Sequence, residues 1–66
     1  MRWDHMPSGQ LRFYGIDAMR VIRELIDGDP NYTWCYAPWP YEWIDVFPKS
    51  VEAQNELVDL VGPSGR

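Results

Sequence analysis

Residues 32–47, YTWCYAPWPYEWIDVF, carry seven aromatic side chains in sixteen positions. Residues 31–36 and 41–47 consist largely of aromatic and β-branched residues, which favour strands. Between them lies the segment Ala37-Pro38-Trp39-Pro40. Proline cannot donate a ladder hydrogen bond, so the strands must end on either side of it. The stretch therefore predicts a β-hairpin.

The segments on either side of this hairpin have the periodicity of amphipathic helices. One helix is predicted from Ile16 and is stopped by Gly28 and Pro30, and the other begins after the N-cap residue Ser50 and ends at Gly62. Their apolar stripes are Ile16, Met19, Ile22, Leu25 and Ile26 in the first helix and Ala53, Leu57, Leu60 and Val61 in the second.

The residues before the first helix alternate as a strand does. Residues 10–15 place Leu11 and Phe13 on one side, and residues 1–6 alternate less regularly before the turn of residues 7–9. The expected fold is α+β, with a small antiparallel sheet in the order β(β)-α-β-β-α and two helices packed on one face. We expect a single small domain over residues 1–62 and a flexible C-terminal tail over residues 63–66.

Size, charge and cysteine content exclude several classes of protein. The chain has 66 residues, a net charge of −4, and a single cysteine and a single histidine, Cys35 and His5. It can form neither an internal disulfide nor a Cys/His zinc site. The scattered cations argue against general nucleic-acid binding, and no apolar run approaches the roughly 18 residues of a membrane span. We expect a soluble cytoplasmic protein, without cofactor or metal, that gains stability from aromatic packing or from self-association.

The number of residues in the hairpin loop decides where the rings point. A four-residue loop, 37–40, pairs Trp34 with Trp43 and Tyr36 with Tyr41. All four rings then share one face with Asp45, and the helices pack on the other face, which holds Cys35, Ile44 and Val46. A loop of three or five residues shifts the register by one. Trp34 and Tyr36 then join Ile44 and Val46, Trp43 joins Cys35, and the rings are mainly structural.

The first register favours a non-enzymatic interaction module. With Tyr32 and Phe47, which fall on the same face, six exposed aromatic side chains would exceed the apolar patch that soluble monomers usually tolerate, so a partner or a second copy would cover them. Trp39, held between two prolines at a loop tip, is a hot-spot candidate, and Asp45 is either a polar anchor or an internally hydrogen-bonded carboxylate. The predicted partner-binding residues are Trp34, Tyr36, Trp39, Tyr41, Trp43 and Asp45. The module would form a homodimer or a higher homo-oligomer and bind a protein partner, as an accessory or inhibitor protein of a virus or mobile element does.

The sequence contains no convincing catalytic group. Cys35 and His5 could in principle form a nucleophile pair, but a mid-strand thiol between aromatic residues is expected to be buried and inert. The alternative function is a module that sequesters a nucleotide-type ligand by aromatic stacking at a subunit interface. Its phosphate contacts would be Arg12, Arg20 and Arg23.

Overall fold

The structure is a computed structural model that describes residues 1–63. The predicted tail of residues 63–66 lies outside the described residues except for Pro63. The elements are β1 (Trp3–His5), β2 (Leu11–Tyr14), α1 (Ile16–Ile26), β3 (Tyr32–Ala37), β4 (Trp43–Pro48) and α2 (Val51–Val61). The α+β class and the element order are as predicted from the sequence, and residues 1–6 do contain a strand.

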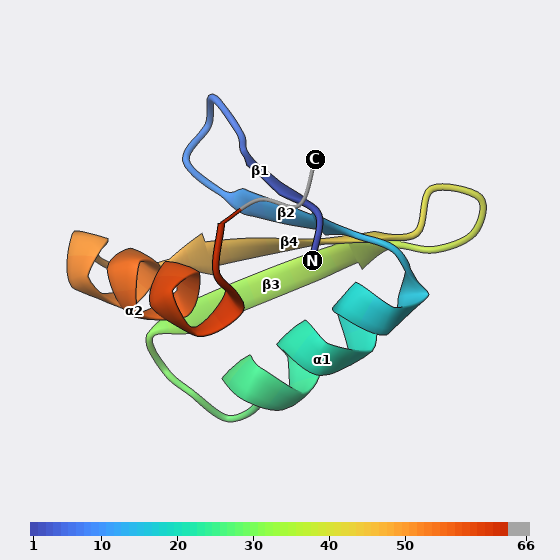
Figure 1. The fold of residues 1–66 in the computed structure, drawn as a ribbon. Coiled ribbons are helices and arrows are strands. Elements are labelled where there is room, and N and C mark those ends of the chain that lie inside the picture. Colours follow the sequence, from blue (N-terminus) through green and yellow to red (C-terminus); the bar gives the residue numbers. More distant parts are fainter. Residues whose placement is uncertain (64–66) are drawn as a thin grey trace.

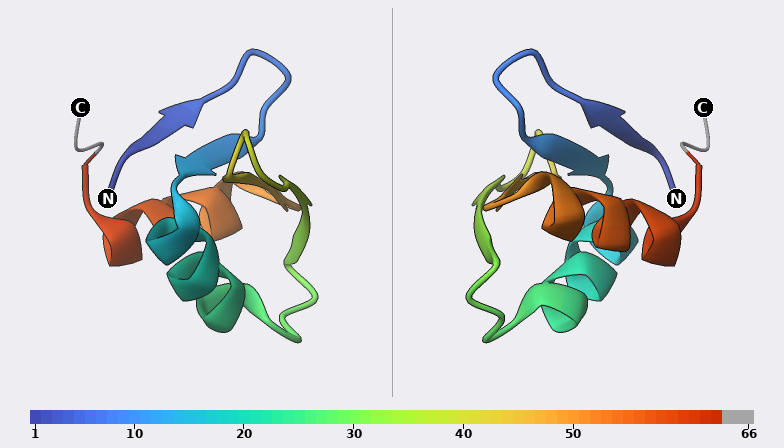
Figure 2. Two further views of the ribbon diagram at one scale, coloured as in Figure 1. Left: turned by 90° about the vertical axis from the view of Figure 1, so that its right-hand side faces the viewer. Right: turned by 90° about the vertical axis from the view of Figure 1, so that its left-hand side faces the viewer.

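The strands form one antiparallel sheet in the order β1-β2-β4-β3, so β1 and β3 are its edges (Figure 1). Both helices lie on the same face of the sheet, as expected (Figure 2). None of the elements formed by residues 1–63 covers the opposite face, which we call the open sheet face. No helix within the described residues is long and apolar enough to cross a bilayer.

The core lies between the helices and the two central strands, β2 and β4. Eight buried side chains form it: Leu11, Phe13, Ala18, Ile22, Ile26, Ile44, Val46 and Leu57. Burying a side chain of the Leu, Ile or Phe type stabilises the fold by about 1.5–3 kcal/mol. Three residues of the predicted stripes are exposed instead of buried: Ile16 at 54%, Leu25 at 44% and Leu60 at 69%. The buried residues are Ala18, Ile22 and Ile26 in α1 and Ala53 and Leu57 in α2, so Ala18 is a core residue that the predicted stripe left out.

Local signals in the sequence fix the ends of both helices. The Ser50 hydroxyl accepts a hydrogen bond from the Ala53 N–H at 3.0 Å, as predicted for an N-cap. Gly28 has the left-handed φ of 74° that a helix stop requires. The side chains of two residues then tie α2 to the sheet. The Tyr32 hydroxyl donates to the Ala53 carbonyl at 2.6 Å, and the Trp3 indole donates to the Gly62 carbonyl at 3.1 Å.

The hairpin register differs from the one that a four-residue loop would give. Tyr36 pairs with Ile44 and Ala37 pairs with Trp43, so the loop consists of the five residues 38–42. The Tyr41 N–H donates to the Pro38 carbonyl at 3.0 Å. The prediction of a single aromatic face is therefore wrong, and the shifted register considered beside it is the one that forms.

Candidate interaction surfaces

The observed register divides the predicted partner-binding residues between the two faces of the sheet. Trp34 and Tyr36 lie on the helix-covered face with Ile44, whereas Trp43 and Asp45 lie on the open sheet face. The expectation that Cys35 faces the helices is corrected for the same reason: it pairs with Asp45 and is exposed on the open face. The predicted single surface is thus replaced by two surfaces on opposite sides of the sheet.

The centre of the open sheet face is an ion pair between neighbouring strands. Arg12 and Asp45 are directly paired on β2 and β4. The Arg12 Nε and Nη2 atoms donate to Asp45 Oδ1 and Oδ2 at 2.8 and 3.1 Å. Asp45 is only 7% exposed, and its hydrogen bond raises the pKa of Arg12 above the ordinary value. Both carboxylate oxygens already have a donor, so Asp45 corresponds to the internally hydrogen-bonded carboxylate rather than to a free polar anchor.

Aromatic rings continue from this ion pair toward the loop. The Arg12 guanidinium lies 4.3 Å from the centre of the Trp43 ring. Trp43 contacts Tyr14 edge-on at 6.4 Å and Tyr41 at 5.2 Å between ring centres. Arg2 caps Tyr14 at 4.6 Å. Trp, Tyr and Arg are the residues that most often dominate protein interfaces, because they offer large contact areas with few rotatable bonds.

The loop of residues 38–42 extends beyond the end of the sheet (Figure 1). At its tip Trp39 is 81% exposed, the largest fraction among the exposed hydrophobic side chains, and Tyr41 is 63% exposed. The loop is anchored at its end, where the Gly15 N–H donates to the Glu42 carbonyl at 2.8 Å. Trp39 therefore projects from a backbone that is held to the rest of the fold.

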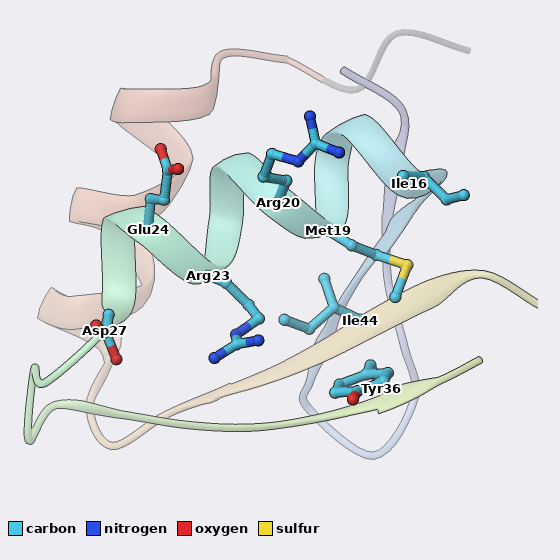
Figure 3. A pocket seen from close by; sticks show the side chains of 8 residues that line it. All are labelled: Ile16, Met19, Arg20, Arg23, Glu24, Asp27, Tyr36 and Ile44. Atoms are coloured by element: carbon cyan, nitrogen blue, oxygen red, sulfur yellow. The ribbon is translucent and has the colours of Figure 1, made fainter.

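A second surface is a groove of about 400 Å³ between α1 and β3, which we call the α1–β3 groove (Figure 3). Arg20 and Arg23 line it from the helix and Tyr36 lines it from the strand. Its other lining residues are Ile16, Met19, Glu24, Asp27 and Ile44.

Rings and charges of both signs meet in this groove. Tyr36 stacks on Trp34 with 5.6 Å between ring centres, and the Arg23 guanidinium lies 4.7 Å from the centre of the Trp34 ring. Of the three predicted phosphate contacts, the structure brings Arg20 and Arg23 together and leaves Arg12 on the opposite face. The part that Glu24 and Asp27 play here was not predicted, although their i,i+4 spacing from Arg20 and Arg23 was the signal for it.

The structure does not bring Cys35 and His5 together. His5 lies on β1 and Cys35 on β3, at opposite edges of the sheet, and their side chains point to opposite faces. The prediction that the thiol is buried is wrong, because Cys35 is exposed. Within residues 1–63 no cluster of His, Cys, Asp and Glu side chains could hold a metal ion.

No family model, curated protein or solved structure matches this chain.

Proposed function

We propose that the chain is a non-enzymatic module that binds a protein partner through the loop of residues 38–42 and the adjoining rings of the open sheet face. The exposure of Trp39, 81% at a proline-flanked loop tip, is the observation that carries the proposal. A large ring held out in water has no stabilising role within the chain. A preorganised ring also loses little conformational entropy when a partner covers it.

The rings beside the loop suit the same contact. Tyr41 and Trp43 touch each other, and Trp43 is fixed in turn by Arg12 and Tyr14. An interface core of this kind contains few free charges, because the charges of Arg12 and Asp45 neutralise each other.

Such a module acts by occupying its partner, as an accessory or inhibitor protein does, and a viral or mobile-element origin remains part of this proposal. We also place it in the cytoplasm, since the exposed thiol of Cys35 would stay reduced there.

The test is affinity capture from a lysate of the source organism with the wild-type chain and with Trp39→Ala. Leu60→Ala is the matched control, because Leu60 is 69% exposed and lies on α2, away from the loop. Removing a hot-spot ring costs about 2 kcal/mol or more, which weakens binding roughly thirtyfold. We expect Trp39→Ala to lose the captured partner and Leu60→Ala to keep it. Equal recovery of that partner with both variants would contradict the proposal.

The α1–β3 groove favours a second candidate function, the sequestering of a nucleotide-type ligand. Tyr36 offers a ring for stacking, and Arg20 and Arg23 offer donors to a phosphate. Glu24 and Asp27 line the same groove and offset the two cations, which places this function second.

Thermal-shift measurements with a panel of nucleotides test this second candidate. A ligand present at 100 times its Kd stabilises the folded state by about 2.7 kcal/mol. The melting temperature of a domain of this size then rises by about 10 °C or more. An unchanged melting temperature with every nucleotide would exclude the candidate.

A further inference from the structure

The edge strand β3 lacks four of the devices that usually protect a sheet edge: short length, a bulge, charged side chains and proline. It is six residues long, whereas the opposite edge strand, β1, has three. Its ladder with β4 runs without a bulge from Tyr32 to Ala37. Its sequence, YTWCYA, contains no charged residue and no proline. Long, flat and apolar edges are templates for a further strand, and proteins normally shorten, charge or twist them.

The phase of the ladder identifies which main-chain groups face outward. The Lys49 N–H donates to the Asn31 carbonyl at 2.8 Å, which makes these two residues a hydrogen-bonded pair. Because such pairs alternate along antiparallel strands, Tyr32, Trp34 and Tyr36 direct their main-chain groups away from β4. The Tyr32 N–H is used by the Asp29 carbonyl at 3.2 Å. The donors left at the edge are therefore the N–H groups of Trp34 and Tyr36.

We propose that this edge pairs with β3 of a second copy of the chain, antiparallel about a two-fold axis at Trp34, so that the two sheets become one. In this register Trp34 lies opposite Trp34 of the second copy, and Tyr36 lies opposite its Tyr32. Both free donors of each copy then find a carbonyl acceptor within the partner strand. Moving the register by two residues would place Tyr36 opposite Pro30 in one direction and Tyr32 opposite Pro38 in the other. Both prolines lie outside β3.

The side chains along the edge suit the same pairing. Trp34 and Tyr36 are stacked on each other, and Tyr36 is still 50% exposed at the rim of the α1–β3 groove. Across the two-fold axis the two Trp34 rings would be cross-strand neighbours, and each Tyr36 ring would face Tyr32 of the second copy, a favourable arrangement for aromatic residues. The pairing buries surface that a small domain otherwise leaves in water.

Charge argues for a second copy rather than for an unrelated strand. α1 runs antiparallel to β3, so that Arg20 lies toward the Tyr36 end of the groove and Asp27 toward its other end (Figure 3). A two-fold axis at Trp34 places the basic end of one helix across from the acidic end of the other. The surface is thus complementary to itself, whereas a peptide of one charge sign would meet repulsion at one end.

The inference does not depend on the proposed function. Strand addition at the β3 edge leaves the open sheet face of each copy uncovered, so a dimer could bind a partner there. The earlier expectation of self-association through one aromatic face is replaced by association through an edge.

The first test combines sedimentation equilibrium with cross-linking of the native thiol. Cys35 is the single cysteine and is exposed. In the proposed register the two Cys35 residues are diagonal neighbours, about 7–8 Å apart. We expect a dimer in solution that a short bis-maleimide cross-links without any engineered cysteine. A monomer at every concentration tested would overturn the inference.

Two substitutions at one position separate edge pairing from contact through a face. Tyr36→Pro removes an outward N–H and leaves the ladder with β4 intact, whereas Tyr36→Ala removes the ring and keeps the N–H. Two hydrogen bonds are lost per dimer with proline, so we expect Tyr36→Pro to weaken the dimer roughly thirtyfold more than Tyr36→Ala. Equal effects, with cross-linking retained, would indicate association through the open sheet face and overturn the inference.

Charge exchange on α1 provides a test that does not depend on the folding of the proline variant, because Arg20 and Asp27 are both exposed. Arg20→Asp and Asp27→Arg should each weaken the homodimer, and the doubly substituted chain should restore it. A mixture of the two single variants should form heterodimers in preference to homodimers. The absence of both rescue and heterodimer preference would refute the two-fold arrangement. A monomeric chain that still captures its partner through Trp39 would overturn this inference alone.

Discussion

Removing the Arg12 guanidinium tests the organisation of the open sheet face most directly. Arg12→Met keeps an unbranched stem over Trp43 and leaves the Asp45 carboxylate without its two donors. The side chain of Asp45 is 10% exposed, so water cannot fully replace those donors, whereas that of Arg12 is 23% exposed. The substitution therefore leaves the nearly buried carboxylate of Asp45 without its ion-pair partner.

The expected cost follows from these exposures. Breaking a fully buried ion pair costs about 3–5 kcal/mol, and the exposure of Arg12 places this pair at about 2–3 kcal/mol. Loss of the cation–π contact with Trp43 adds about 0.5–1 kcal/mol at a partly exposed site. A domain below 70 residues rarely has more than about 3–5 kcal/mol of stability. We therefore expect Arg12→Met to lose about 3 kcal/mol and to be partly unfolded at 25 °C.

The assay is urea denaturation followed by far-ultraviolet circular dichroism, since the fluorescence of Trp43 would respond to the substitution itself. Asp45→Asn is the matched control. Its amide oxygen still accepts a hydrogen bond from Arg12, and the guanidinium can turn toward water, so a loss of about 1 kcal/mol is expected. A free energy of unfolding for Arg12→Met within about 0.5 kcal/mol of wild type, the usual range for a surface substitution, would refute this reasoning.

Three further substitutions test separate parts of the fold. Burial, and then the charge of Glu56, raise the pKa of Tyr32 above its ordinary value. The contribution of Tyr32 to stability is therefore full below the unfolded-state pKa of about 10 and is lost as the pH rises through the folded-state pKa. Tyr32→Phe should show a smaller alkaline loss of stability in denaturation curves than wild type; an equal loss would contradict this. Ser50→Ala should cost about 1 kcal/mol through loss of the N-cap of α2, measured by urea denaturation, and no change would exclude that role. Ile22→Val should cost about 0.5–1.5 kcal/mol, because Ile22 is fully buried; a neutral result would contradict its place in the core.

The fold class was predictable because its signals are local. Gly28 and Ser50 mark helix boundaries by main-chain geometry and capping, and both behave in the structure as the sequence indicates. Within α1, however, the predicted apolar stripe included Leu25, which is exposed, and left out Ala18, which is buried. A helix that packs over two central strands buries a narrow face, and sequence periodicity does not record the width of the surface beneath it.

The hairpin register was not predictable, because the loop length depends on contacts outside the hairpin. Glu42 adopts a left-handed φ of 54°, and its carbonyl accepts a hydrogen bond from Gly15 at the junction of β2 and α1. That contact connects residues far apart in the sequence. The stretch of residues 37–42 alone is compatible with a loop of four or five residues, and the choice moves every following side chain to the other face.

The register determines how the surface can bind as well as where the rings lie. A four-residue loop would have placed Trp34 and Tyr36 on the same face as Trp43 and Asp45, as one continuous aromatic face. The observed register instead moves Trp34 and Tyr36 to the helix-covered face. The open face is left with Trp43, fixed beside the ion pair of Arg12 and Asp45. A face of this composition is tolerated in water and still offers hot-spot residues to a partner. The open sheet face therefore does not require a second copy of the chain to cover it. The unpaired main-chain groups of β3 are the feature that favours self-association.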